Sequence, residues 1–371
     1  MRSRAAQSGE KELSLNFEDM TMPFTADAIA QAGKAAIDFI IKQKPEDLYN
    51  TERPLLKMLQ STKKSFPGAK QYINEKLRLT NDANFQWFGP DEQVDYNRKD
   101  TLGEANFGWG SAHDGFALTE EELLQNYITV TDDVGAAATT SEKHQFINLM
   151  KENTETLMLG FKEKFDYDLH LDGTQDADAI PGLDAFIAID PTTGTVGGID
   201  RSVAANAFWR NQVNLDLTIA NMLDSMEDTW RACTRVGGNS PNMILAGSVF
   251  IDAYRAAVKA DQVMQVNVAQ KGGFTLDGGN TGLFYKGLPI IWDMVTDDLE
   301  AALSPTQQWD SRCYFINTRF IKLRPAQGQD MVVRKPPRAY DRYTHYWGLT
   351  WRGAMTITRP SAMAVLSATG S

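Results

Sequence analysis

The fold of this chain is decided by one stretch, Gly182-Leu-Asp-Ala-Phe-Ile-Ala-Ile-Asp-Pro-Thr-Thr-Gly-Thr-Val-Gly-Gly-Ile-Asp-Arg201, which Phe208-Trp-Arg-Asn211 follows. Its first half is apolar, and Ala185 to Ile189 are predicted to form a short strand. Its second half is rich in Gly, Thr and Asp, which favour turns. Because Gly194 to Gly198 lack the lysine and the following helix of a phosphate-binding loop, we expect a turn there.

The composition of the 371 residues is that of an ordinary globular protein. Hydrophobic residues make up 42% and charged residues 23% of the chain. No stretch approaches the roughly 18 to 20 uninterrupted apolar residues of a membrane span. The basic start, Met1-Arg-Ser-Arg4, has no apolar segment behind it, so we expect no secretory signal. The length allows two or three packed units.

The charge balance argues against a dedicated DNA-binding protein. The net charge is −11, whereas a duplex-DNA binder carries a concentrated basic face. The basic cluster of the chain consists of Arg334, Lys335, Arg338 and Arg342. We interpret it as a solvated loop or a patch between subunits in preference to nucleic-acid recognition, and whether it faces DNA or a neighbour stays open. Two distant cysteines, Cys233 and Cys313, are expected to be core residues.

The sequence carries no recognisable catalytic, cofactor or metal motif, so we assign no such residue. The group Asp166, Asp168, His170 and Asp172 has oxygens that can bind a hard cation. It lacks the glycine and the terminal glutamate of an EF-hand, and we therefore expect a solvated loop just past a helix end. The acidic run Glu120 to Glu122 is better explained by helix capping than by acid–base catalysis.

Residues 70 to 118 predict a long hairpin. Lys70 to Leu79 alternate as a strand does, and Gly103 to His113 form the expected return strand. The aromatic residues assigned to its tip are Phe85, Trp87, Phe88, Tyr96 and Trp109. A two-stranded hairpin with little apolar surface of its own is marginal in water, so we expect a neighbouring subunit to cover this tip.

The strongest helix is predicted after the capping box Thr139-Thr-Ser-Glu142. About 26 residues would make it about 40 Å long. Its core positions are Phe146, Leu149, Met150, Leu157, Met158, Phe161 and Phe165. A second capping box at Thr119 opens a short helix through Asn126.

The remaining elements are shorter. Other expected helices lie over 28–41, over 219–230 with a stop at Gly237-Gly238, and over 249–263. Pro54 is expected to begin an irregular stretch. Strands are expected over 241–247, 284–285, 289–292, 313–316, 320–324 and in the apolar run 351–366.

Three passages, taken in order, carry a resemblance. The first is the helix exit Leu171-Asp-Gly-Thr174 with Gly182-Leu-Asp-Ala185 and Thr195-Val-Gly-Gly-Ile-Asp-Arg201. The others are Tyr285-Lys-Gly-Leu-Pro-Ile-Ile291 and Ile357-Thr-Arg-Pro-Ser-Ala-Met363. With a long hairpin before a capped long helix, this order resembles the major capsid proteins of tailed phages, which have the Hong Kong 97-type fold. The resemblance covers nearly the whole chain and depends on the order of elements more than on signature residues.

The resemblance implies an α+β fold in five parts. They are an N-terminal arm (1–65), an E-loop hairpin (66–125), a P-domain with a long spine helix (126–212), an α/β A-domain (213–335) and the closing strands of the P-domain (336–371). A-domains would meet around five- and six-fold axes, and E-loops would lie across neighbouring P-domains.

The resemblance also implies function and partners. The protein would be made in the host cytoplasm and would assemble with copies of itself, as pentamers and hexamers, into a virion shell around double-stranded DNA, which it contacts non-specifically. Portal, scaffolding and decoration proteins would be further partners. By the same resemblance the protein would bind no cofactor, catalyse no reaction and contact no membrane. Two alternatives stay open: an encapsulin-like compartment shell, and a soluble α/β enzyme or binding protein whose site has no recognisable motif.

Overall fold

A computed structural model describes residues 53–68, 71–78, 85–96, 101–126, 140–260, 280–303, 308–336 and 343–368. The helix expected over 28–41 and the basic residues Arg338 and Arg342 lie outside these ranges. By their contacts, the described residues fall into two compact units. One comprises those of Gly115–Glu155 and Lys335–Trp347, and the other comprises those of Gln43–Asp114, Thr156–Arg334 and Gly348–Ser371.

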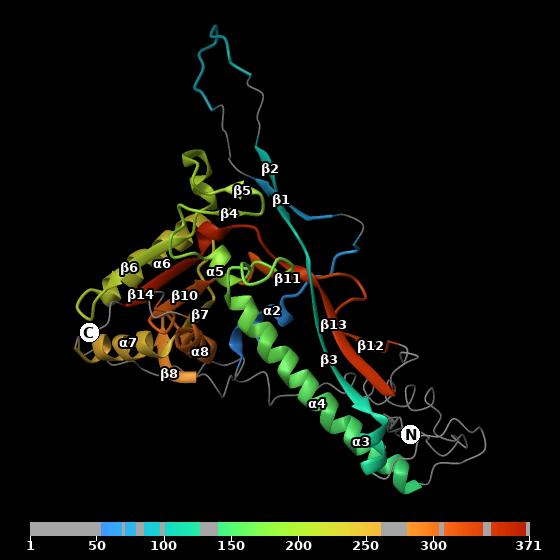
Figure 1. The fold of residues 1–371 in the computed structure, drawn as a ribbon. Helices are drawn as coiled ribbons and strands as arrows, with labels where there is room; N and C mark the ends of the chain where they lie inside the picture. Colours follow the sequence, from blue (N-terminus) through green and yellow to red (C-terminus); the bar gives the residue numbers. More distant parts are fainter. Residues whose placement is uncertain are drawn as a thin grey trace, which may run out of the picture. The chain divides into compact units, whose positions relative to one another are not determined.

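A six-stranded mixed sheet organises the larger unit (Figure 1). Its order is β6-β14-β10-β7-β9-β8. The strands are β6 (Gln212–Leu217), β7 (Met243–Ala246), β8 (Asn280–Tyr285), β9 (Leu288–Trp292), β10 (Arg312–Ile316) and β14 (Ala364–Ala368). The central strand β10 is antiparallel to both β7 and β14, whereas β14 runs parallel to β6 and β7 runs parallel to β9. All of the expected strands in this region are confirmed.

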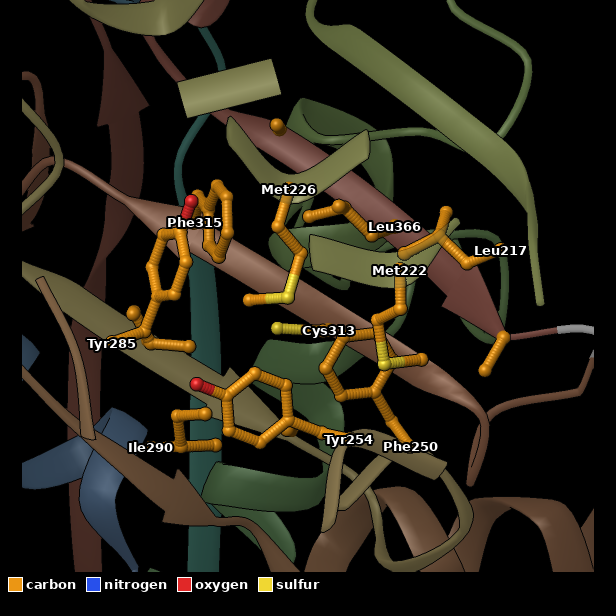
Figure 2. Packing of buried hydrophobic residues seen from close by; sticks show 14 of the residues in the cluster. Leu217, Met222, Met226, Phe250, Tyr254, Tyr285, Ile290, Cys313, Phe315 and Leu366 are labelled. Atoms are coloured by element: carbon orange, nitrogen blue, oxygen red, sulfur yellow. The ribbon is translucent and has the colours of Figure 1, made fainter. Parts of the chain in front are cut away.

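One face of this sheet is covered by the helices α6 (Met222–Gly237) and α7 (Ser248–Ala260), and both confirm the expected periodicity. Strand residues two apart, such as Cys313 and Phe315, share that face because side chains alternate along a strand. Figure 2 shows these side chains packed against Met222, Met226 and Phe250 from the helices. Cys233 and Cys313 are free and buried here, as small core residues.

The helix α6 ends where the sequence predicts. Gly238 follows it in the left-handed region, with a φ of 71°, and donates its backbone N–H to the Thr234 carbonyl. Glycine adopts this conformation at little cost, so it is the usual residue after a helix C-terminus.

A four-stranded sheet joins the later part of the chain to the hairpin region. Its order is β11-β13-β12, with β3 also paired to β13. The strands are β3 (Gly110–Thr119), β11 (Ile321–Pro325), β12 (Val332–Arg334) and β13 (Thr344–Ile357). The short 3₁₀ helix η3 (Pro360–Ala362) connects β13 to β14, so the apolar C-terminal run is confirmed as two strands.

The expectation of an irregular stretch after Pro54 is wrong. Pro54 is the first residue of the helix α2 (Pro54–Ser61), where its missing N–H costs nothing and its fixed φ suits the helix. Leu55, Leu56 and Leu59 of α2 are buried. A second helix that the sequence did not predict is α8 (Met294–Ala302), in which Val295 and Leu299 pack with Trp309.

The long helix is confirmed as α4 (Thr140–His170), which has 31 residues and so extends five residues past Phe165. Six of the seven predicted core positions are buried, and Leu149 is half-buried. The predicted capping box before α3 (Glu120–Gln125) is also confirmed. Thr119 Oγ1 accepts from the Glu122 N–H at 3.2 Å, and Glu122 Oε2 accepts from the Thr119 N–H at 2.8 Å.

The hairpin pairs β1 (Ile73–Arg78) with β2 (Leu102–Phe107) in the register Ile73 to Phe107 and Arg78 to Leu102. The expected single return strand is wrong, because it divides between β2 and β3 around Gly108 and Trp109. The first half of the deciding stretch is also different from expectation. Ala185 and Phe186 belong to a helical turn, α5 (Leu183–Phe186), and the stretch 185–189 forms no strand.

Candidate functional site: the hairpin and its exposed tip

The glycine-rich turn of the deciding stretch supports the root of the hairpin. Gly197 and Gly198 connect β4 (Thr195–Val196) to β5 (Ile199–Asp200), and both have positive φ values, 60° and 78°. Consecutive residues of this conformation form the tight turn that a two-residue hairpin loop needs. The Gly197 carbonyl accepts the Asn106 N–H of β2 at 2.8 Å. A Cβ at Gly197 would meet Ala105 Cβ and Phe107 Cζ at 3.0 Å, so the two backbones approach closely.

Buried side chains extend this support. Phe107 of β2 meets Phe186 of α5 edge to face, with ring centroids 5.9 Å apart. Trp209, in the 3₁₀ helix η2 (Ala204–Trp209), donates its indole N–H to the Val196 carbonyl at 2.9 Å. The buried Arg201 donates from Nη2 to the Phe186 carbonyl at 2.8 Å, and burial lowers its pKa to about 10.

The hairpin therefore has an apolar base, whereas its tip exposes large aromatic side chains. Ile73, Leu77, Ala105 and Phe107 are buried at the base. At the tip, Phe85 is 75%, Trp87 is 87%, Phe88 is 68% and Tyr96 is 92% exposed. Phe85 and Trp87 contact each other edge to face at 5.3 Å. Clustered exposed aromatics of this kind mark interaction surfaces.

The tip also bends sharply and is acidic. The Glu92 N–H donates to the Gly89 carbonyl at 3.2 Å, while Glu92 Oε2 accepts the Gly89 N–H at 3.0 Å. Asp91, Glu92 and Asp95 are all exposed. Between Phe85 and Tyr96 there is no lysine or arginine, so the surface that the tip presents is both aromatic and negatively charged.

Trp109, which the sequence groups with the tip, lies between β2 and β3. Its indole N–H donates to the Gln71 carbonyl at 2.9 Å, and its ring meets Phe66 edge to face at 5.1 Å. It is 40% exposed. Trp109 thus packs beside the hairpin root, and only its outer part is available to a partner.

The basic cluster is described only in part. Arg334, at the end of β12, donates from Nε to Thr350 Oγ1 at 3.1 Å and from Nη2 to Gln329 Oε1 at 2.5 Å. Lys335 follows it, half-buried, and Arg338 and Arg342 lie outside the described residues. Arg334 is therefore held along the sheet.

The expectation of a solvated loop at Asp166 to Asp172 is wrong. His170 is the last residue of α4 and is fully buried, and its Nε2 lies 2.9 Å from Asp293 Oδ2. Asp166 is also buried, 3.6 Å from Arg53 Nη1. We name Arg53, Asp166, His170 and Asp293 the charged cluster; Asp166, His170 and Asp293 are buried, and Arg53 is partly exposed. Distance along the chain concealed it, since Asp293 follows His170 by 123 residues.

Protonation in this cluster follows from burial and charge. Burial by itself lowers the pKa of His170, but the carboxylates of Asp293 and Asp166 outweigh it and raise that pKa to about 9. Burial raises the pKa of Asp166 to about 6, although His170 and Arg53 favour its ionised form. The described part of the chain contains no group of His, Cys, Asp or Glu side chains arranged to hold a metal ion.

Among the helices of the described residues, none has both the length and the apolar character needed to cross a membrane. No protein-family model and no curated protein matches the sequence.

Solved structures do match the fold. The cyanophage A-1(L) capsid asymmetric unit is similar with a TM-score of 0.58 and 14% identity, covering 87% of this chain and 94% of that chain. A structure from Microbacterium phage Oxtober96 is similar with a TM-score of 0.50 and 10% identity, covering 84% of this chain and 90% of that one. At such identities the likeness concerns the fold. The expected mixed α and β fold is confirmed, and the chain shares it with a phage capsid structure.

Proposed function

We propose that this chain is the major capsid protein of a tailed phage, which assembles into an icosahedral shell around double-stranded DNA. The observation that carries the proposal is the hairpin tip on a fold shared with a phage capsid structure. Four large aromatic side chains at the tip are mostly exposed. Burying each of these side chains against another protein would contribute roughly 1.5 to 3 kcal/mol to association. An isolated chain leaves them in water and does not gain this free energy.

The proposed roles of the parts of the chain follow the Hong Kong 97-type arrangement. Residues 66–125 act as the E-loop, 126–212 with 336–371 as the P-domain, 213–335 as the A-domain and 1–65 as the N-terminal arm. The apolar base holds the hairpin on its own subunit, while the tip reaches a neighbour in a pentamer or hexamer. Shell formation needs no catalytic step, and the protein acts in the virion with portal, scaffolding or decoration proteins as partners.

A compartment shell of the encapsulin type, with another cargo, is the alternative within the same fold. The contents of purified shells distinguish the two. Co-purifying double-stranded DNA that nuclease cannot reach supports the phage head, whereas an enclosed protein cargo supports the compartment.

The experiment that tests assembly is negative-stain microscopy of the expressed protein. We expect shells, sheets or capsomers. A monodisperse monomer that persists at high concentration, even with host lysate present, would overturn the proposal. Deleting residues 82–100 should leave a folded subunit and block closed shells, because it removes the tip and spares the buried base. Normal shells from that deletion would refute the role of the hairpin.

A further inference from the structure

A basic groove lies beside the root of the hairpin. Its volume is about 390 Å³, and we define it by four cationic side chains: Lys76 and Arg78 on β1, Arg319 after β10 and Arg359 after β13. Its apolar walls include Phe208 and Phe320. None of the lining residues that the structure describes is acidic. Such a concentration of positive charge is unusual in a chain whose net charge is −11.

Two of the four cations of the groove are held in place by their surroundings. The guanidinium groups of Arg319 and Arg359 lie 5.9 Å and 5.5 Å from the centre of the Phe320 ring. Arg359 Nη1 also donates to the Val236 carbonyl at 3.1 Å. On β1, the strand partner of Lys76 is Glu104, whose Oε2 accepts instead from Asn74 Nδ2 at 3.3 Å. The groove therefore presents positive charge, and two of its cations are held beside the aromatic ring of Phe320.

The hairpin tip, residues Phe85 to Tyr96, is chemically complementary to this groove. It carries three exposed carboxylates and no basic residue, together with four exposed aromatic rings. Carboxylates pair with arginine through charge-assisted hydrogen bonds, and aromatic faces attract arginine and lysine cations. No tip residue lines the groove in the single chain, so the groove is open to the tip of another copy.

A larger cavity of about 520 Å³ is a poorer match for the tip. It is lined by Lys164 but also by four carboxylates, Asp114, Asp168, Asp176 and Asp178. Like charges brought together at an interface oppose binding, so an acidic tip would be repelled there.

We infer that the basic groove of one subunit is the docking site for the acidic aromatic tip of a second copy of this chain. The inference rests on the proposed function and specifies which two surfaces meet during assembly. Asp91, Glu92 and Asp95 pair with the groove cations, and the tip aromatics cover Phe208 and Phe320.

Charge reversal on each surface tests this pairing. The groove variant carries Lys76→Glu, Arg78→Glu and Arg319→Glu, which changes the sum of its four defining charges from +4 to −2 and keeps Arg359 in place. The tip variant carries Asp91→Lys, Glu92→Lys and Asp95→Lys. We expect each to lose shells by electron microscopy while remaining folded by circular dichroism. Arg352→Glu, at an exposed arginine outside the groove, is the matched control and should assemble normally. A chain that carries both sets of changes should regain shells, since reversed charges again attract.

Mixing the groove variant with the tip variant shows whether a tip docks on a second copy of the chain or on its own subunit. When groove and tip variants are combined, the normal tip of one meets the normal groove of the other, and the two reversed surfaces also match. We expect the mixture to form hexamers and sheets in which the two variants alternate, as read from differently tagged subunits sedimenting together; closed shells are not the readout, because a ring of five cannot alternate. If the doubly changed chain forms hexamers or sheets and the mixture forms neither, the tip docks on its own subunit and the inference is overturned.

Two further results would overturn the inference. One is a groove variant that forms normal shells. The other is a groove variant whose shells form but fail to retain packaged DNA, which would identify the groove as a phosphate-binding surface. Failure of the unmodified chain to form any assembly would instead count against the proposed function. The two failures are therefore distinguishable.

Discussion

His170 Nε2 lies 2.9 Å from Asp293 Oδ2, and both side chains are fully buried. The pair connects the last residue of α4 to the residue that caps the first turn of α8, where Asp293 Oδ1 accepts the Val295 N–H at 3.3 Å. His170 Nδ1 faces the Asp166 carbonyl oxygen at 2.8 Å. Both ring nitrogens therefore face acceptors, which favours the doubly protonated, charged ring.

This arrangement predicts a loss of stability at alkaline pH. The folded-state pKa of His170 is raised from 6.5 to about 9. Its contribution to stability is therefore fully present below pH 6.5 and is lost as pH rises through about 9. We expect His170→Asn to destabilise the subunit by about 3 kcal/mol near neutral pH, since Asp293 is left buried and unpaired. The difference from the unmodified chain should shrink across this window.

Urea unfolding at a series of pH values measures this effect. His113→Asn is the control, because His113 is exposed and its replacement leaves the pair of His170 and Asp293 intact. Parallel profiles for the unmodified chain and His170→Asn would contradict the assignment of a charged His170.

The turn beneath the hairpin gives a second prediction, at two adjacent glycines. Gly197 and Gly198 both have positive φ, which asparagine tolerates better than other side chains. A Cβ at Gly197 meets Ala105 and Phe107 at 3.0 Å, whereas nothing lies within 4 Å of one at Gly198. Gly197→Asn should therefore destabilise the subunit by about 1 to 3 kcal/mol more than Gly198→Asn.

Chemical denaturation of the two variants gives the comparison directly, because backbone strain is similar in both. Limited proteolysis adds a local readout, since loosening of the hairpin root should expose cleavage sites near β2. Equal unfolding free energies for the two variants would mean that Ala105 and Phe107 move aside for the added side chain at no measurable cost.

The sequence predicted elements whose apolar pattern persists over several turns. The seven positions from Phe146 to Phe165 mark α4 unambiguously, because only a helix places them on one face. The same holds for α6, whose end is further marked by Gly238. The capping box at Thr119 was predictable because its hydrogen bonds join residues three apart.

Several short elements were not predictable, because contacts distant in sequence decide them. Ala185 to Ile189 are apolar enough for a strand, yet Phe186 lies in a helical turn. The Phe186 carbonyl accepts a hydrogen bond from the Arg201 guanidinium, 15 residues later in the chain. Pro54 reads as a breaker unless it begins a helix, which it does. The return strand divides at Gly108, and its second half pairs with β13, more than 200 residues away.

The candidate site was predictable in part for the same reason. Aromatic residues set among Asp, Asn and Gly indicated an exposed tip, and four of the five are largely exposed. Trp109 was misplaced because only the fold shows its contact with Phe66. The basic groove gathers Arg78, Arg319 and Arg359 from three distant segments, so no local pattern reveals it.

The core of the larger unit provides a third prediction. Phe250 on α7 is fully buried in the cluster of Figure 2, whereas its neighbour Val249 is 36% exposed. Phe250→Ala should cost about 3 to 5 kcal/mol, the sum of lost apolar burial and a cavity. Val249→Ala is the matched control on the same helix and should cost less than about 1 kcal/mol. Thermal unfolding followed by circular dichroism measures both, and equal losses would contradict the packing described.

The tip provides the last prediction, which separates folding from assembly. Trp87 is 87% exposed and Phe107 is 2% exposed, although both belong to the hairpin. Trp87→Ala should leave the melting temperature of the subunit unchanged, because its ring makes little contact within the chain. It should nevertheless reduce shell yield at least about tenfold, since losing 1.5 to 3 kcal/mol of burial at each contact weakens association by that order.

Phe107→Ala should instead lower the melting temperature, because it empties the buried base. Sedimentation of shells and thermal unfolding of isolated subunits give the two readouts. If Trp87→Ala destabilises the subunit as much as Phe107→Ala does, the tip packs on its own chain and is not an assembly surface.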